Sequence, residues 1–275
     1  MGISLRHHVL ALVASFLMLL VGLLVGVGLS SEPGLQERLD KVEARFEVLW
    51  GENQALQEGA NRQEEFAQAV LPRLVQGTLH GQVIPLLITT RPLRQSDDAA
   101  TQLTDALEAA GARVPYRLAW DDDFAERAVG AYDGDTAAAC EAATKAVAAA
   151  VLGADEEALQ KLRKRKLIRL QGEVPREAPT AIVVLGGAES EAESGEELID
   201  RPLLEALAAA GLTRVVGCEA TPPASYISLY RDFDISTVDN VDSGRGQVSA
   251  AWALAGQSGD YGDQSSARRP FPERQ

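Results

Sequence analysis

An uninterrupted apolar run lies near the N-terminus of the chain. Residues 9–29 read VLALVASFLMLLVGLLVGVGL, twenty-one residues without a charge or a proline. A helix of this length rises about 1.5 Å per residue and spans a hydrocarbon core of about 30 Å. A cleaved signal peptide has a shorter apolar region of about 7–15 residues and a small-residue cleavage site, which this run lacks. The pattern therefore predicts an uncleaved transmembrane signal anchor.

The flanking charges predict the orientation of this anchor. Arg6 precedes the apolar run, so the positive-inside rule places residues 1–8 in the cytoplasm and the main part of the chain outside it. Gly22 and Gly26 have the small-xxx-small spacing that lets two membrane helices approach closely. We expect a single-pass membrane protein with an extracytoplasmic main domain, and both an inner and an outer membrane remain open.

A second pattern follows, in which apolar positions step by three and four residues. Its members are Leu39, Val42, Phe46, Leu49, Asn53, Leu56, Ala60, Gln63, Ala67, Val70 and Leu74. This a/d heptad spacing predicts a coiled-coil stalk over residues 30–78. Asn53 occupies an a position, where a buried asparagine can specify a two-stranded register. We expect a parallel homodimer through the stalk; the alternative is a single helix that packs on its own domain.

Residues 79–256 then show two similar strand–helix–strand units. The first has an apolar run at residues 82–90 and a helix, AATQLTDALEAAG, that ends at Gly111. The second has an apolar run at residues 180–185 and a helix, RPLLEALAAAG, that ends at Gly211. Such units predict parallel strands joined by helical crossovers. We therefore expect an α/β domain with a Rossmann-like, doubly wound and mainly parallel sheet made of two related halves.

The remaining segments carry weaker patterns. Residues 122–170 lie between the two halves and read as mainly helical. The acidic stretch at residues 189–200 lacks the ligand spacing of an EF-hand loop and reads as a solvated loop. Residues 257–275 are rich in glycine, serine, arginine and proline, which predicts a disordered tail.

The charge balance and the missing motifs exclude several classes of function. The chain has 26 Lys and Arg against 40 Asp and Glu, a net charge of −14, which disfavours nucleic acid as a partner. No P-loop, G-x-G-x-x-G or G-x-S-x-G motif is present. Only His80, of three histidines, follows the apolar run. We expect no enzymatic activity.

Ligands for a soft metal are scarce after the anchor. Copper(I) prefers thiolate and thioether ligands, and copper(II) accepts imidazole. Both methionines, Met1 and Met18, lie in or before the apolar run, which leaves Cys140, Cys218 and His80 as weak candidates. The two cysteines either form a disulfide outside the cytoplasm or are two separately buried thiols.

Three stretches, taken in order, resemble a known family. They are SLRHHVLALVASFLMLLVGLLVGVGL, QVIPLLITT and, at residues 236–262, STVDNVDSGRGQVSAAWALAGQSGDYG. This arrangement resembles the actinobacterial family of mycobacterial copper-transport protein B. The resemblance implies a role in copper efflux or resistance, with copper as a possible ligand. For some members it implies instead an envelope scaffold that binds a protein partner in cell division or cell-wall control.

The most specific of these features are the stretch at residues 238–242, the glycine-containing helix that follows it and the Asp-Tyr-Gly ending. Asp239, Asn240 and Asp242 offer oxygen atoms that can coordinate a cation or receive a partner. The alternative is structural, because aspartate and asparagine commonly form turns and cap the helix that begins near Ser243. Both interpretations remain open from the sequence.

Overall fold

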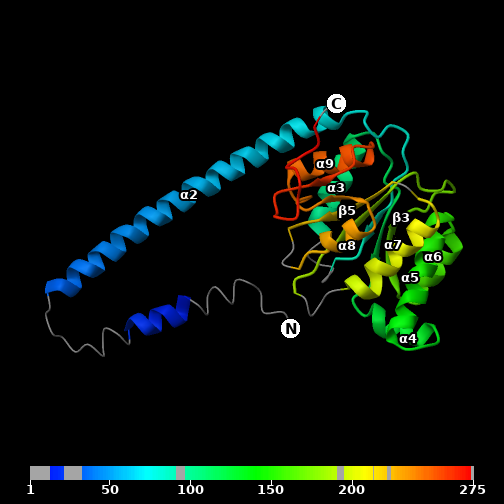
Figure 1. Ribbon diagram of the computed structural model, residues 1–275, viewed down its shortest axis with the longest axis horizontal. Helices are drawn as coiled ribbons and strands as arrows, with labels where there is room; N and C mark the ends of the chain where they lie inside the picture. The colour runs from blue at the N-terminus through cyan, green and yellow to red at the C-terminus, as the bar shows by residue number, and fades with distance from the viewer. Residues whose placement is uncertain are drawn as a thin grey trace. The chain divides into compact units, whose positions relative to one another are not determined.

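The computed structural model describes residues 13–21, 33–90, 97–190, 195–212, 214–221 and 224–273. The chain forms two compact units, Met1–Ala60 and Asn61–Gln275 (Figure 1). The long helix α2, Pro33–Val75, begins in the first unit and ends in the second. Pro72 lies in its last turn, where the helix stops three residues later.

The predicted membrane span falls mostly outside the described residues. Residues 13–21 are helical, whereas residues 9–12 and 22–29, with Gly22 and Gly26, are not described. Among the helices that the structure describes, none combines the length and the apolar character needed to cross a membrane.

The second unit is built on one seven-stranded sheet. Its strand order is β3-β2-β1-β4-β5-β6-β7. The strands are β1 Leu86–Ile88, β2 Tyr116–Trp120, β3 Ile168–Gly172, β4 Ile182–Gly186, β5 Val215–Glu219, β6 Ser236–Val238 and β7 Asp260–Tyr261. Among these described strands, only the β2–β3 pair is antiparallel. The prediction of an α/β domain with a mainly parallel sheet is confirmed.

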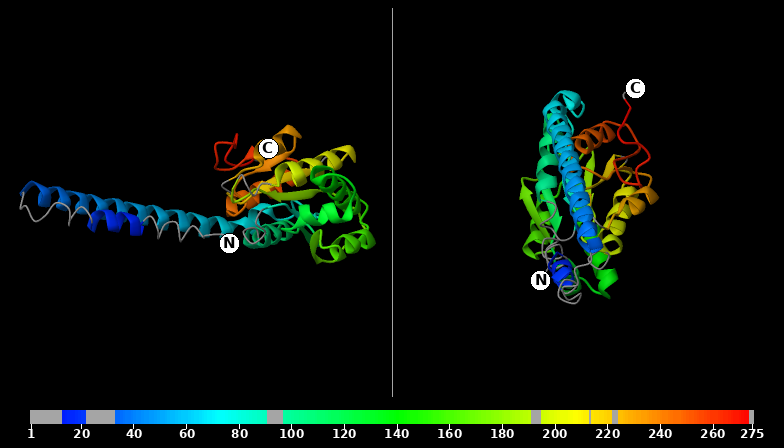
Figure 2. Two further views of the ribbon diagram at one scale, coloured as in Figure 1. Left: turned by 90° about the horizontal axis from the view of Figure 1, so that it is seen from below. Right: turned by 90° about the vertical axis from the view of Figure 1, so that its left-hand side faces the viewer.

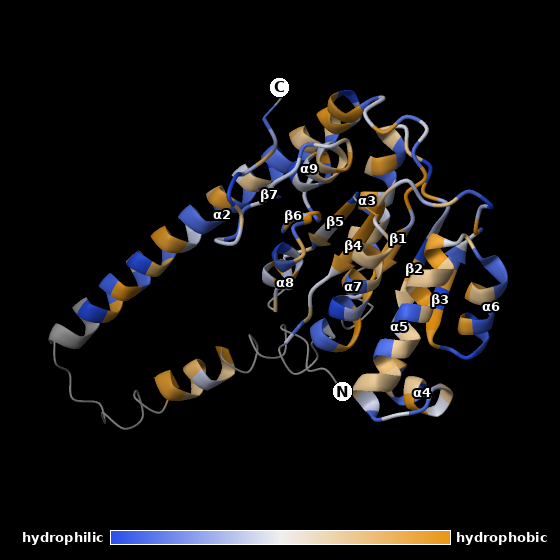
Figure 3. Cartoon of the chain, turned by 45° about the vertical axis from the view of Figure 1, so that its right-hand side comes forward, coloured by the Kyte–Doolittle hydropathy of each residue, from blue (hydrophilic) through white to orange (hydrophobic). Residues whose placement is uncertain are grey.

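Helices cover both faces of this sheet (Figure 2). One face carries α4 Phe124–Ala131, α5 Thr136–Leu152, α6 Glu156–Lys164, α7 Arg201–Ala209 and α8 Ile227–Asp232. The other carries α3 Asp97–Ala109, α9 Gly244–Leu254 and the end of α2. Strand β4 is buried along its whole length, with Val184 in one core and Val183 in the other. Its continuous apolar run, orange in Figure 3, is typical of a strand covered on both faces.

The two halves predicted from the sequence occupy equivalent places in this sheet. Strands β1 and β4 are parallel neighbours, with Leu87 opposite Val184. From this pair the chain proceeds outward in opposite directions, through α3 to β2 and through α7 to β5, and the two helices lie on opposite faces. This placement is the one expected of two halves related by a pseudo-twofold axis between β1 and β4, and that relation stays a prediction. The Rossmann-like assignment is a further step that stays a prediction.

Both helices of the repeat end at a glycine with positive φ, 91° for Gly111 and 74° for Gly211. We expect Gly111→Val and Gly211→Val each to lower the free energy of unfolding by about 1–2 kcal/mol, because a β-branched residue is strained there. The Gly111 variant should lose more stability than the Gly211 variant. A Cβ at position 111 would lie 3.4 Å from the His80 backbone, whereas a Cβ at position 211 meets nothing within 4 Å. Urea unfolding measures the losses.

The control for this prediction is Gly130→Ala within α4. A Cβ at Gly130 meets nothing within 4 Å, and the residue is not among the glycines with positive φ. Its unfolding free energy should stay the same or rise slightly. A similar loss in all three variants would contradict the assignment of Gly111 and Gly211 as helix caps.

One crossover departs from the others. The crossovers through α7, α8 and α9 each move the chain by one strand in the same direction, from β4 to β7. Helix α9, however, lies on the opposite face of the sheet from α7 and α8, beside α3. This crossover therefore has the opposite hand to the other helical crossovers between neighbouring parallel strands of the described sheet. Crossovers of one hand are strongly preferred in proteins. The loop between β6 and α9 runs along the carboxyl edge of the sheet, where Asn240 pairs with Ala220 and the Val241 N–H donates to the Glu219 carbonyl.

The segment after α9 differs from the disordered tail expected for residues 257–275. Residues 260–261 form β7, in which Asp260 pairs with Thr237 of β6. The backbone N–H of Gly262 donates to the Arg269 carbonyl over 3.0 Å. Residues 257–273 thus have defined contacts, and the last two residues lie outside the described part of the chain.

Candidate functional site

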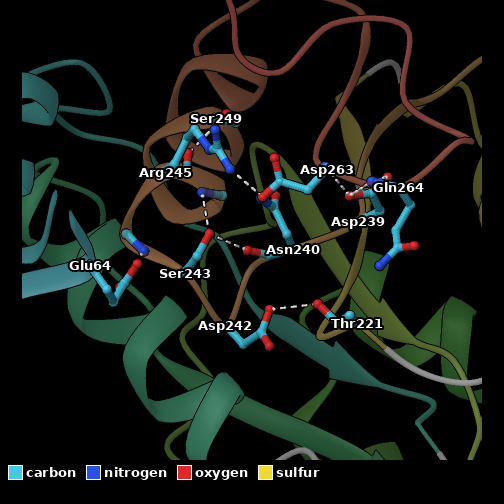
Figure 4. Close-up of polar contacts among 12 residues, drawn as sticks. Glu64, Thr221, Asp239, Asn240, Asp242, Ser243, Arg245, Ser249, Asp263 and Gln264 are labelled. Carbon is cyan, nitrogen blue, oxygen red and sulfur yellow. Dashed lines mark hydrogen bonds and ion pairs between the residues drawn. The ribbon is translucent and has the colours of Figure 1, made fainter. Parts of the chain in front are cut away.

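The Asp239 carboxylate lies at the carboxyl end of β6 and is 2% exposed. Its Oδ1 accepts a hydrogen bond from the backbone N–H of Asp263 at 2.8 Å (Figure 4). Its Oδ2 accepts from the backbone N–H of Gln264 at 3.2 Å and from the Ser266 hydroxyl at 3.0 Å. Both oxygens of this carboxylate therefore hold the C-terminal segment on the sheet.

Asn240 extends the same connection. Its Nδ2 donates to Oδ2 of Asp263 over 2.8 Å, and Arg245 forms an ion pair with the same carboxylate. The Asn240 carbonyl accepts from the hydroxyl of Ser243 at 2.8 Å. A Cβ on Gly246 would lie 2.0 Å from this carbonyl oxygen, so only glycine fits there. The loop at residues 239–243 and the Gly-Arg-Gly sequence that begins α9 therefore form one compact local structure, in which glycine is required at position 246.

Asp242 and Ser243 complete the loop. Oδ1 of Asp242 accepts from the Thr221 hydroxyl at 3.2 Å, and burial raises the pKa of this carboxyl. Ser243 is the N-cap of α9, and its Oγ accepts from the backbone N–H of Gly246 at 3.1 Å. These bonds match the turn and capping roles that the sequence left open; a ligand on Asp239, Asn240 and Asp242 stays a prediction.

The base of the stalk helix packs on the same end of α9. Oε1 of Glu64 accepts from the backbone N–H of Gly244 at 2.8 Å, where the positive end of the helix dipole favours a carboxylate. A Cβ on Gly244 would lie 3.0 Å from the Cβ of Ala67, so glycine allows this close approach. Nε1 of Trp252 donates to the Leu74 carbonyl at 3.4 Å. The last turns of α2 are therefore part of the second unit.

A buried carboxyl that the sequence did not single out lies at the same edge of the sheet. Asp200 is fully buried, and its Oδ1 accepts from the Thr89 hydroxyl at 2.8 Å and from the Tyr230 hydroxyl at 2.7 Å. Its Oδ2 has no hydrogen-bond partner among the described residues. Burial raises its pKa to about 7. The expectation of a solvated loop is therefore corrected at Asp200, where the η3 helix, Glu196–Asp200, turns the side chain inward.

Glu219 is its companion at the end of β5. Oε2 accepts from the Ser225 hydroxyl at 2.7 Å, and Oε1 accepts from the backbone N–H of Tyr226. Burial raises the pKa of Glu219 to about 7, and Asp239 adds to the shift by like-charge repulsion. The only sequence signal for this residue is a glutamate directly after the buried run VVGC.

The weak metal candidates lie in different parts of the fold. Cys140 of α5 and Cys218 of β5 are both buried, in the cores on opposite faces of the sheet, and no disulfide joins them. Burial raises the pKa of the Cys218 thiol, which disfavours the thiolate that binds copper. His80 is exposed in the turn between α2 and β1. In the described residues, no group of three or more His, Cys, Asp or Glu side chains is placed to hold a metal ion.

Comparison with known protein families identifies the family of the chain. No curated protein matches the chain. Over residues 2–272, nearly its whole length, the chain matches a family described as "Copper transport outer membrane protein, MctB". This agrees with the resemblance seen in the N-terminal run, the QVIPLLITT strand and the VDNVDSGRG loop. The chain therefore belongs to the MctB family of copper transport outer membrane proteins.

Proposed function

We propose that the protein serves copper export or resistance as an anchored, non-enzymatic component of the cell envelope. In this proposal residues 9–29 anchor the chain in a membrane, and the head acts by binding another envelope protein. The family match supports the link to copper and to the outer membrane. It leaves open which membrane holds the anchor.

The contact between stalk and head carries the scaffold part of this proposal. Glu64 caps α9 over 2.8 Å, and Leu71 and Val75 of the same helix are buried in the head core. A continuous helix of 43 residues thus ends inside the head rather than in a flexible linker. Such a helix extends over about 60 Å at about 1.5 Å per residue. The direct join between the stalk helix and the head is the observation on which the scaffold proposal rests.

The placement of the two thiols supports a partner-dependent role in copper handling. Cys140 and Cys218 lie on opposite faces of the sheet and are both fully buried. We expect the purified full-length protein in detergent to bind copper(I) weakly, with no stoichiometric site of sub-nanomolar affinity. Titration against a competing chelator measures the affinity. A sub-nanomolar site that is lost in Cys140→Ala or Cys218→Ala would contradict this expectation.

A genetic test separates direct copper ligation from a scaffold role. Deletion of the gene should lower copper tolerance, and a chain that carries both Cys140→Ala and Cys218→Ala should restore it, at equal abundance on an immunoblot. Failure of this variant alone would favour direct ligation by the thiols. Unchanged copper tolerance in the deletion strain would contradict the copper role. Partners captured from crosslinked envelopes would then test the alternative, a scaffold in cell division or cell-wall control.

A further inference from the structure

The N-terminal part of α2 presents an apolar face to solvent. Leu39, Val42, Phe46, Leu49 and Leu56 are between 42% and 73% exposed. All five occupy a or d positions of the heptad pattern, so they lie along one stripe of the helix. Isolated exposed apolar residues are common on proteins, but a continuous stripe of this kind indicates a binding surface.

Contacts with the head determine where the exposed stripe ends on the C-terminal side. Ala67 continues the heptad at an a position, but it lies against Gly244 of α9 in its own chain. Leu71 and Val75, farther along, are buried in the core of the head. The predicted seam over residues 30–78 therefore cannot continue between two chains beyond about Ala60 without separating α2 from α9. The available stripe covers residues 39–56.

We propose that residues 38–57 of two chains form a short parallel coiled coil in register, because their exposed a/d stripe carries Asn53 at an a position and is flanked by g and e residues that complement each other in that arrangement. This partner is a second copy of the same chain. The pairing depends neither on copper nor on the proposed scaffold role, so each can fail without the other.

The flanking positions supply the argument for register. In a parallel dimer a g residue faces the e residue five positions later in the partner. Arg38 then faces Glu43 of the partner subunit, an oppositely charged pair. Arg45 faces Trp50 of the partner subunit, where a guanidinium over the indole gives a cation–π contact. Side chains five residues apart on one helix do not meet, so these pairs form only between chains.

The a positions supply the argument for orientation. In a parallel dimer, a residues face a residues, so Asn53 faces Asn53 of the partner subunit and their amides can hydrogen-bond. In an antiparallel dimer, a residues face d residues, which would bury Asn53 against an apolar side chain without a partner. Such an unpaired buried amide costs about 1–3 kcal/mol. The parallel arrangement is therefore favoured.

Because the seam is short, its pairing depends on the concentration of the chains around it. Eighteen residues, 39–56, amount to about two and a half heptads, which is little for a coiled coil in dilute solution. Anchoring two chains in one membrane raises their effective concentration without any new contact. The test therefore uses the full chain in its membrane.

Disulfide crosslinking of engineered cysteines tests the seam. Leu56→Cys lies at a d position, whereas Glu58→Cys, two residues later, lies at an f position on the outer face. Under mild oxidation, Leu56→Cys should give at least five-fold more covalent dimer than Glu58→Cys. The parent chain serves as the blank, because Cys140 and Cys218 are fully buried. Equal crosslinking at the two positions would overturn the proposal.

A mixture of two tagged variants tests the orientation. In a parallel dimer Leu39→Cys and Leu56→Cys each crosslink to themselves, since the same residues face each other. In an antiparallel dimer the two variants crosslink chiefly to one another. Predominance of the mixed product would overturn the parallel arrangement.

A charge exchange tests the register. Glu43→Arg in the Leu56→Cys background places a cation against Arg38 of the partner subunit, so crosslinking should fall several-fold. Adding Arg38→Glu restores the opposite charges and should restore crosslinking. Glu47→Arg, at a b position outside the seam, is the matched control and should leave the yield unchanged. No restoration in the double variant, or an equal fall in the control, would overturn the proposed register.

Discussion

Replacing Asp239 with alanine is expected to release the C-terminal segment from the sheet and to lower the free energy of unfolding by about 2–4 kcal/mol. The carboxylate accepts three hydrogen bonds, from the backbone of Asp263 and Gln264 and from the Ser266 hydroxyl. A hydrogen bond to a charged group contributes about 1.5–3 kcal/mol. The three bonds share one carboxylate and are not additive, and the released backbone donors bond to water once the segment leaves the sheet, so the net loss stays below their sum. The side chain is too deeply buried for water to replace it without rearrangement.

Limited proteolysis with trypsin follows the release directly. Arg268 and Arg269 are exposed at their side chains, but their backbone N–H groups donate to the Asp260 carbonyl at 3.0 and 3.1 Å. Cleavage after Arg268 should be faster in Asp239→Ala than in the parent chain, whereas the Arg269–Pro270 bond resists trypsin. Urea unfolding gives the change in stability. The control, Asp242→Ala, removes the bond from Thr221 at an exposed position and should lose less than about 1 kcal/mol of stability. Equal losses in both variants would argue against the anchoring role of Asp239.

The stability of the head is expected to fall as the pH rises from about 4 to about 7. The folded-state pKa of both Asp200 and Glu219 is about 7, above the ordinary values of 3.8 and 4.5. Between these limits the folded chain holds protons that the unfolded chain has released, so raising the pH favours unfolding. Each such proton changes the unfolding free energy by about 1.4 kcal/mol per pH unit. Above pH 7 the contribution of this pair should be constant.

Urea unfolding at several pH values measures this slope. Asp200→Asn keeps an oxygen for Thr89 and Tyr230 but cannot ionise, so the fall between pH 5 and pH 7 should become smaller. Adding Glu219→Gln should nearly abolish the contribution of this pair to the slope of the unfolding free energy against pH. The slope is the deciding quantity, because the new amides change the stability equally at every pH. A slope that persists in the double variant would show that other groups bind the protons.

The local patterns of the sequence predicted the helices and buried strands well. The apolar run at residues 82–90 contains β1, and the run at residues 180–185 covers β4 except for its last residue, Gly186. Gly111 and Gly211 end the helices as positive-φ residues. Strand β3 was not foreseen, because its exposed and intermediate residues carry no strong alternation and its neighbour β2 lies almost fifty residues earlier.

The side chains at the carboxyl edge were harder to predict because their environment is set over long distances. Asp200 belongs to an acidic stretch that reads as solvated, yet its partners Thr89 and Tyr230 lie 111 and 30 residues away in the sequence. The composition of the tail likewise predicts disorder, whereas Asp239 binds the tail from 24 to 27 positions upstream. Periodicity shows which face of a segment is buried, but not which segment covers it.

For the stalk, too, the periodicity of the sequence shows which face is covered but not what covers it. The heptad pattern predicts a long helix, and α2 is continuous over Pro33–Val75. It does not distinguish a partner helix from the molecule's own head as the surface that covers Ala67, because both require an apolar or small residue at that position. Gly244 decides between them by allowing α9 to approach.

The cap that Glu64 provides for α9 joins residues 180 positions apart, which has a consequence for the order of assembly. A ribosome adds about 5–20 residues per second, so about 10–40 s pass between the synthesis of these two residues. During that interval the last turns of α2 are without their cover, while the stripe at residues 39–56 is already complete. Neighbouring nascent chains can therefore pair before either head has closed on its own stalk.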